Sequence, residues 1–142
     1  MNLTPFDIDK DKFAQQIREH FNKNYLINGQ KGVAKFVVEK ILKDVDGKLM
    51  YICTDPSRQI YRFKSTDGFI ERDVKAKKLT SALYDEIRSK SHSISTEETR
   101  DNSNDIFLIY SGRFGDIKEL DEDNSEFIME LSKIKLKRFK KL

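Results

Sequence analysis

Positively charged side chains recur through the middle of the chain at positions that suit contact with phosphate groups. The seven lysines and arginines between positions 58 and 78 are Arg58, Arg62, Lys64, Arg72, Lys75, Lys77 and Lys78. Lysine and arginine bind the backbone of nucleic acid without reading its sequence, and an aromatic side chain among them can stack on a base. The predicted phosphate contacts are Arg58, Arg62, Lys75, Lys77 and Lys78, with Tyr61 as the predicted stacking residue.

A second interpretation of the same residues stays open. Glu71, Asp73 and Asp85 are close in the sequence and could pair with the basic side chains. The result would be an ordinary solvated surface, neutralised locally, with no function in binding a polyanion.

A second candidate site is the segment Gly29-Gln30-Lys31-Gly32, which lies between two predicted helices. Two glycines allow backbone N–H groups and the start of the next helix to approach a phosphate closely. Loops of the form GXXG clamp single-stranded nucleic acid in KH domains. Lys31 is therefore a further predicted phosphate contact, and the alternative is a plain turn between helices.

No set of residues predicts catalysis, a bound metal or a cofactor. The chain has two histidines and one cysteine, and none of them is spaced from another as zinc ligands are. Asp44, Asp46 and Gly47 resemble the start of a calcium loop, but Asp55 stands where the closing glutamate belongs, so we predict a turn. We expect a protein that is not an enzyme.

The distribution of charge along the chain is uneven. Residues 29–90 carry fourteen basic and nine acidic side chains, residues 101–131 carry two and nine, and residues 132–142 carry six and none. Such segregation indicates a polyanionic partner or contact between oppositely charged surfaces. The start of the chain lacks the pattern of a signal peptide, and no apolar run is long enough to cross a membrane. With Cys53 as the single cysteine, we expect an intracellular protein.

Apolar periodicity predicts an α+β fold. The predicted order begins with a helix that Asp9 or Asp11 caps and that runs to about Tyr25, followed by a central helix over residues 30–43 that is apolar on more than half of its circumference. Strands over residues 48–54 and 59–64 follow with a turn at Asp55-Pro56-Ser57 between them, and a second turn at Thr66-Asp67-Gly68 leads to a short third strand at residues 69–70. Asp73 caps a closing helix over residues 73–88. The strands would form an antiparallel hairpin or three-stranded meander. We divide the chain into a core of residues 1–90, a polar linker of residues 91–104 and a C-terminal helix of residues 105–142 that ends in a basic tail.

The C-terminal stretch has a heptad rhythm. Its central positions are Ile117, Leu120, Asn124, Phe127 and Leu131. A single asparagine within such a seam fixes register and partner number in coiled coils. These five residues are thus predicted to join copies of the chain, and the alternative is a helix that folds back on its own core.

Three segments of the chain, GQKGVAKFVVEKILKD, YICTDPSRQIYRFK and RDVKAKKLTSAL, are similar to an uncharacterised family of proteins encoded by giant DNA viruses. The resemblance covers residues 29–88. It implies no active residues, and it implies a setting in the cytoplasm, a viral factory or the virion. The segment DGFIERDVKAKKLTSAL also resembles small viral DNA-binding modules of the KilA-N type.

Two functions follow as expectations. The first is a non-catalytic nucleic-acid-binding module that self-associates through its C-terminal helix. The second is a structural or adaptor protein that assembles with other proteins and binds no nucleic acid.

Overall fold

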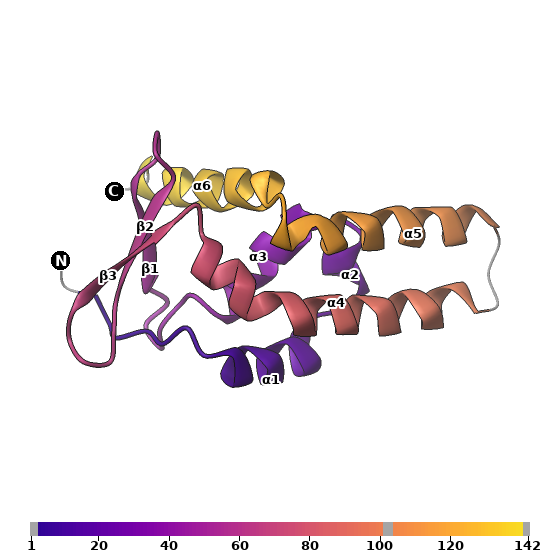
Figure 1. Ribbon diagram of the computed structural model, residues 1–142, viewed down its shortest axis with the longest axis horizontal. Coiled ribbons are helices and arrows are strands. Elements are labelled where there is room, and N and C mark those ends of the chain that lie inside the picture. The colour runs from indigo at the N-terminus through magenta and orange to yellow at the C-terminus, as the bar shows by residue number, and fades with distance from the viewer. Residues whose placement is uncertain (1–2, 101–103, 141–142) are drawn as a thin grey trace.

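The computed structural model describes residues 3–100 and 104–140, and for residues 134–140 it describes the backbone only. The described residues form an α+β fold with one three-stranded antiparallel sheet (Figure 1). Its elements are α1 (Lys10–His20), α2 (Lys23–Leu26), α3 (Gln30–Lys40), β1 (Tyr51–Asp55), β2 (Ile60–Lys64), β3 (Ile70–Val74), α4 (Lys77–Thr99), α5 (Asn104–Lys118), a 3-10 turn η1 (Glu119–Asp121) and α6 (Ser125–Lys140). The predicted fold class is confirmed.

The sheet has the order β1-β2-β3, and its side chains alternate between two faces. Tyr51, Tyr61 and Phe63 point into the core, as does Asp73 from the edge strand β3. The outer face of the sheet carries Ile52, Arg62 and Arg72, which lie side by side on β1, β2 and β3. The third strand is longer than predicted, because β3 continues through five residues along β2.

The predicted first helix is two helices in the structure. Asp9 caps α1 as expected, since its carboxylate accepts hydrogen bonds from the backbone of Asp11 and Lys12. Phe21 is extended, with φ −73° and ψ 125°, and Asn22 caps the short helix α2. The break allows the ring of Phe21 to pack edge-on against Phe36 at 5.3 Å between ring centroids.

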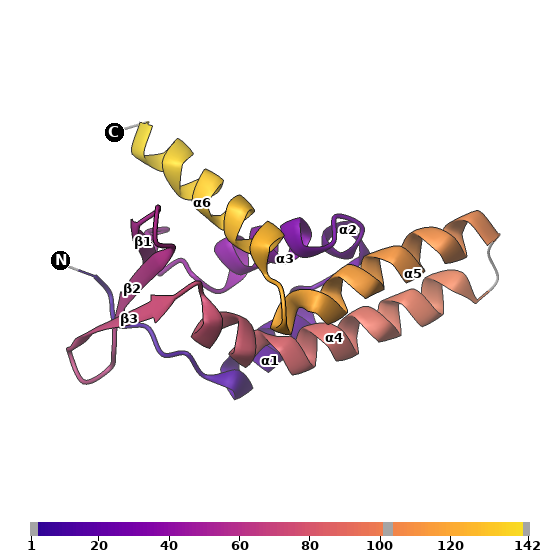
Figure 2. The same cartoon turned by 45° about the horizontal axis from the view of Figure 1, so that its top comes forward.

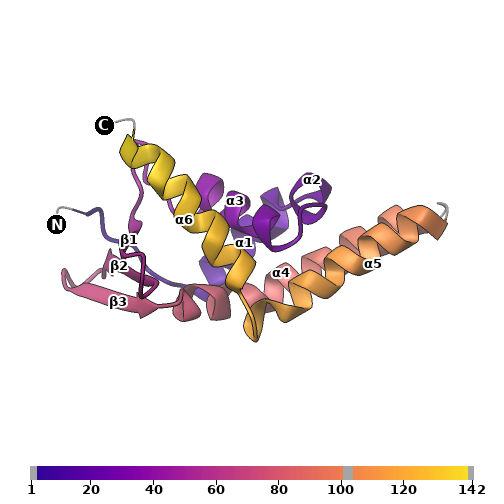
Figure 3. The ribbon, with the colours of Figure 1, turned by 90° about the horizontal axis from the view of Figure 1, so that it is seen from above.

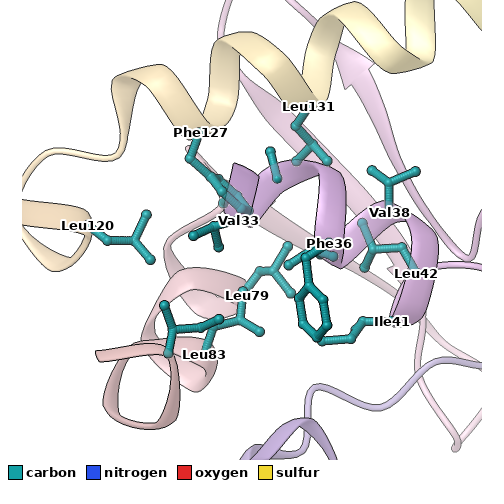
Figure 4. Close-up of a cluster of buried hydrophobic side chains, with 14 of the residues drawn as sticks. Val33, Phe36, Val38, Ile41, Leu42, Leu79, Leu83, Leu120, Phe127 and Leu131 are labelled. Carbon is teal, nitrogen blue, oxygen red and sulfur yellow. The ribbon is translucent and has the colours of Figure 1, made fainter. Parts of the chain in front are cut away.

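The core lies between α3, α4 and α6, and it uses α3 on several sides (Figure 4). Phe36 from α3 and Phe127 from α6 are both fully buried. Leu79 and Leu83 line the facing side of α4. The prediction of a central, largely buried second helix is therefore confirmed.

Helix α4 is longer than predicted and packs beside α5 as an antiparallel helical hairpin that projects from the core (Figures 1 and 3). Residues 91–99, which the sequence predicted as part of a linker, are the last turns of α4. Ser91 and half-buried Ile94 continue the stripe begun by Leu83 and Ile87. Small hydroxyl side chains fill this end of the stripe, so the periodic apolar signal fades although the helix continues.

The C-terminal segment is not one helix but α5, η1 and α6, which turn back over the core (Figure 2). The predicted seam residues serve the chain itself: Ile117, Leu120, Phe127 and Leu131 are buried in the core, and the amide of Asn124 donates 2.8 Å to the carbonyl of Lys75. For these five residues the structure agrees with the alternative, in which the C-terminal segment folds back on the core of its own chain. A second copy of the chain cannot use them as a seam while the core is intact.

Gln30, at the start of α3, fastens this segment to the core. Its side-chain nitrogen donates to the carbonyls of Asp116 at 3.1 Å and Asp123 at 2.9 Å, and its oxygen accepts from the backbone of Phe127 at 3.3 Å. Gln30 is 4% exposed. A buried amide with these three partners satisfies polar groups at the end of α5 and at the start of α6.

Candidate nucleic-acid interface

The junction between β3 and α4 presents three of the predicted basic residues. Lys75 and Ala76 both have positive φ, 58° and 55°, which turns the chain sharply into α4. The backbone of Lys75 donates 2.7 Å to the carbonyl of Gln59, which also has positive φ. This bond brings the β1–β2 turn, which carries Arg58, next to the start of α4, which carries the exposed residues Lys77 and Lys78.

The first turn of α4 is held by a buried carboxylate. Asp73 accepts hydrogen bonds from the backbone N–H groups of Lys78 at 2.9 Å and Leu79 at 3.1 Å. The sequence predicts that this helix starts at Asp73, but Asp73 belongs to β3, and the helix begins at Lys77 with Ala76 at its N-cap. The Asp73 carboxylate reaches the first-turn N–H groups from the end of the strand. Because this carboxylate occupies the N–H groups, the anion-binding capacity of the junction rests on the lysine side chains.

The outer face of the sheet carries two arginines directly opposite each other. Arg62 on β2 and Arg72 on β3 are partners in the strand register, so their side chains leave the same face. Arg62 donates 3.3 Å to the hydroxyl of Thr54. Lys64 leaves the same face two residues along β2, opposite Ile70. The sheet thus aligns like charges from the centre of β2 to its end at Lys64.

The carboxylates that could neutralise this group are engaged elsewhere or face away. Asp73 is buried, and Asp85 pairs with Lys10 at 2.6 Å. Glu71 opposes Phe63 in the register and so belongs to the other face of the sheet. Among the described residues, one member of the group has an ion pair: Arg58 lies 3.6 Å from Asp55. The pKa of Asp55 is held below its ordinary value, chiefly by the hydroxyl of Ser57.

The predicted stacking role of Tyr61 is wrong. Tyr61 is 1% exposed, its ring stacks on Tyr51 at 5.1 Å, and its hydroxyl lies 3.1 Å from that of Ser132. Burial raises the pKa of Tyr61 to about 12. A base cannot reach this ring, because Tyr61 and Arg62 are neighbours in a strand and must point to opposite faces.

An aromatic side chain that the sequence analysis missed is exposed instead. Phe69 ends the β2–β3 turn, directly after Gly68, and it is 74% exposed. Its backbone carbonyl accepts from Ser65, which fixes the turn at the end of β2 that carries Lys64. An aromatic residue inside a turn, where no periodic pattern requires a core residue, is the signal that identifies it.

The glycines of the GXXG segment serve packing and not phosphate binding. A Cβ on Gly32 would lie 1.7 Å from the carbonyl oxygen of Tyr25. A Cβ on Gly29 would lie 2.9 Å from a carboxylate oxygen of Asp116, and a carboxylate repels phosphate. Lys31 is exposed on the first turn of α3, and no described contact joins it to the basic residues of the sheet. The plain-turn alternative therefore describes this loop.

Among the described residues, no three or more histidine, cysteine, aspartate or glutamate side chains lie together as a metal site would require. None of the described helices has the length and apolar character needed to span a bilayer.

The site is therefore a surface on one face of the sheet and at the β3–α4 junction, which we call the basic surface: Arg58, Arg62, Lys64, Arg72, Lys75, Lys77 and Lys78, with Phe69 at one end. Comparison with known proteins adds no assignment to it: no family model, curated protein or solved structure matches the chain.

Proposed function

We propose that the chain is a non-catalytic module that binds the phosphate backbone of a nucleic acid across the basic surface. The observation that carries the proposal is the pairing of Arg62 with Arg72 on a solvent-facing sheet, without an ion pair to a described carboxylate. Like charges directly opposite each other weaken a sheet by up to about 1 kcal/mol. A bound polyanion removes that repulsion.

The extent of the basic surface favours a strand of nucleic acid over a single phosphate. A five-residue strand such as β2 spans about 16 Å, and lysines or arginines stand along it and beyond its end at the β3–α4 junction. Phe69 provides an exposed ring where the track ends at the β2–β3 turn. A basic track with an aromatic side chain is typical of proteins that bind single-stranded nucleic acid by stacking and charge. The setting that we propose is intracellular, in a cytoplasm, viral factory or virion.

The test is a salt-dependent affinity measurement. Fluorescence anisotropy would follow the binding of single-stranded and double-stranded oligonucleotides of equal length to the full chain between low and physiological salt. The triple variant Lys75→Gln, Lys77→Gln, Lys78→Gln and the double variant Arg62→Gln, Arg72→Gln should weaken binding. Each should also reduce the slope of log affinity against log salt by about 0.7 to 0.9 for every phosphate contact removed.

A matched control has the same loss of charge elsewhere. The triple variant Lys35→Gln, Lys40→Gln, Lys43→Gln changes three exposed lysines in and just after α3. It should keep the slope and nearly all of the affinity. Equal slopes for the two triple variants, or no binding by the unmodified chain at low salt, would reject the proposal. Weaker binding of Phe69→Ser to single strands alone would assign a stacking role to that ring.

A second candidate function, a structural or adaptor protein, is favoured by one observation. Phe107, Leu108 and Ile109 follow one another on α5 with exposed fractions of 55%, 66% and 48%. Large apolar side chains exposed together are typical of surfaces that contact other proteins. If the chain fails to bind nucleic acid in the titration above, this function takes precedence.

A further inference from the structure

Helix α5 presents an apolar groove that the core does not cover. The groove has a volume of about 350 Å³, and its walls are Leu108, Ile109, Gly112, Arg113 and Asp116. These residues recur at intervals of three and four, so they share one side of the helix. The opposite side of α5 is the one that the fold uses, since Tyr110 and Ile117 are buried there against α4.

The groove combines a projection with a notch. Leu108 and Ile109 stand out from the helix, and a Cβ built at Gly112 meets no atom within 4 Å. Glycine costs about 1 kcal/mol relative to alanine inside a helix, and among the described residues no close contact at Gly112 requires a glycine there. A notch of this kind lets the side chain of a neighbouring helix approach the backbone closely.

Charge along the groove selects the partner's direction. Asp105 lies in the first turn of α5, before the apolar residues, and Arg113 lies after them, 3.5 Å from Asp116. A parallel copy of the helix would set Asp105 beside another Asp105. An antiparallel copy sets Asp105 of each chain toward Arg113 of the other, and it sets the projecting residues of each against the notch of the other. The surface is therefore complementary to itself.

We propose that the occupant of this groove is a second copy of the chain, bound in an antiparallel two-fold contact between the α5 helices. The proposal goes beyond the proposed function: it keeps the self-association that the sequence predicts, and it is independent of nucleic-acid binding. It moves the contact from the buried seam of residues 117–131 to the exposed side of α5. Because a fifteen-residue helix is only about 22 Å long, the contact is small, and we expect a dimer that dissociates on dilution.

Sedimentation velocity on the full, nuclease-treated chain over a range of micromolar to near-millimolar concentrations tests the proposal. The unmodified chain should shift from monomer toward dimer as its concentration rises. Gly112→Leu fills the notch and Leu108→Ser removes a projection, so each should move the shift to at least tenfold higher concentration. Failure of this experiment leaves the nucleic-acid titration unaffected, because no nucleic acid is present.

The controls separate the groove from general effects on α5. Phe107→Ser removes an exposed apolar side chain that lies outside the groove, and it should sediment like the unmodified chain. Gly112→Leu should melt at the same or a higher temperature, because leucine favours helix more than glycine does. A chain that stays monomeric at every concentration, a dimer that both groove variants retain, or a dimer that only Phe107→Ser disrupts would each overturn the proposal.

Discussion

The hydroxyl of Tyr51 donates a 2.9 Å hydrogen bond to the carboxylate of Asp73, and both residues are almost completely buried. The same carboxylate accepts from two backbone N–H groups at the start of α4. One acidic side chain thus connects the first strand, the edge strand and the longest helix. Burial raises the pKa of the Tyr51 phenol well above its ordinary value, and the neighbouring carboxylate raises it further.

Removing this carboxylate should destabilise the protein strongly. Asp73→Ala leaves two helix N–H groups and a buried hydroxyl without their partner, and we expect a loss of about 3 kcal/mol in the free energy of unfolding. Tyr51→Phe leaves the helix cap in place and should cost about 1 kcal/mol. Urea unfolding measures both. Asp67→Ala, in the exposed β2–β3 turn, is the control, and a cost for Asp73→Ala no larger than the control's would contradict the role of the cap.

Gln30→Ala should loosen the C-terminal helix before the rest of the fold. The substitution removes three hydrogen bonds to α5, the segment after η1 and α6, and we expect a cost of about 2 kcal/mol. Hydrogen exchange should accelerate most at the backbone amides of α6. Gln15→Ala removes one exposed side-chain hydrogen bond on α1 and provides the comparison. Unchanged hydrogen exchange in α6 would show that the Gln30 side chain does not hold α6 to the core.

Three glycines should respond differently to alanine. Gly32→Ala forces a Cβ to within 1.7 Å of a backbone oxygen, so we expect a loss above about 4 kcal/mol or an insoluble chain. Gly47→Ala has space but keeps a φ of 79°, which should cost about 1 kcal/mol. Gly112→Ala has space and a helical backbone and should gain up to about 1 kcal/mol. Thermal unfolding ranks the three, and a Gly32→Ala protein with an unchanged melting temperature would refute the packing role.

Stability should fall in alkaline solution. The pKa of Tyr25 and that of Tyr61 are each raised from 10.0 to about 12, in both cases chiefly by burial. The unfolded chain loses these protons from about pH 10 while the folded chain keeps them until about pH 12. The stability present below pH 10 is therefore lost as the pH rises through this window, by about 2 kcal/mol for a residue as buried as Tyr61. Urea unfolding of Tyr61→Phe should show a shallower decline between pH 10 and 12 than the unmodified chain, and identical declines would contradict the assignment.

The sequence predicts well those elements whose signal is local. Asp9 caps a helix where expected, and Asp55 and Gly68 mark the turns of the sheet. Asp73 bonds the first turn of α4, although this helix begins four residues later than predicted. The inward orientation of Tyr61 could also be predicted from the sequence, because Tyr61 and Phe63 alternate with Arg62 along one strand. The mistaken stacking role came from grouping residues by proximity in the sequence without applying the two-residue period of a strand.

The remaining features depend on partners far along the chain. A helix face with heptad spacing looks the same whether it packs on its own core or on another copy, so Phe127 and Leu131 could not distinguish the two cases. The end of α4 has few apolar residues of its own, and it remains helical while packed beside α5, which lies later in the chain. The exposure of the α5 groove follows from what the fold leaves uncovered, which local patterns do not encode.

The three hydrogen bonds of the Gln30 side chain also affect the order in which the parts of the protein can fold during synthesis. Its partners lie 86 to 97 positions later in the chain, so during synthesis this amide cannot complete these hydrogen bonds until Phe127 has left the ribosome. The first ninety residues then emerge with an open apolar flank on α3, where Phe127 will later dock. A nascent chain in that state exposes apolar surface, which stays uncovered until α6 packs on α3.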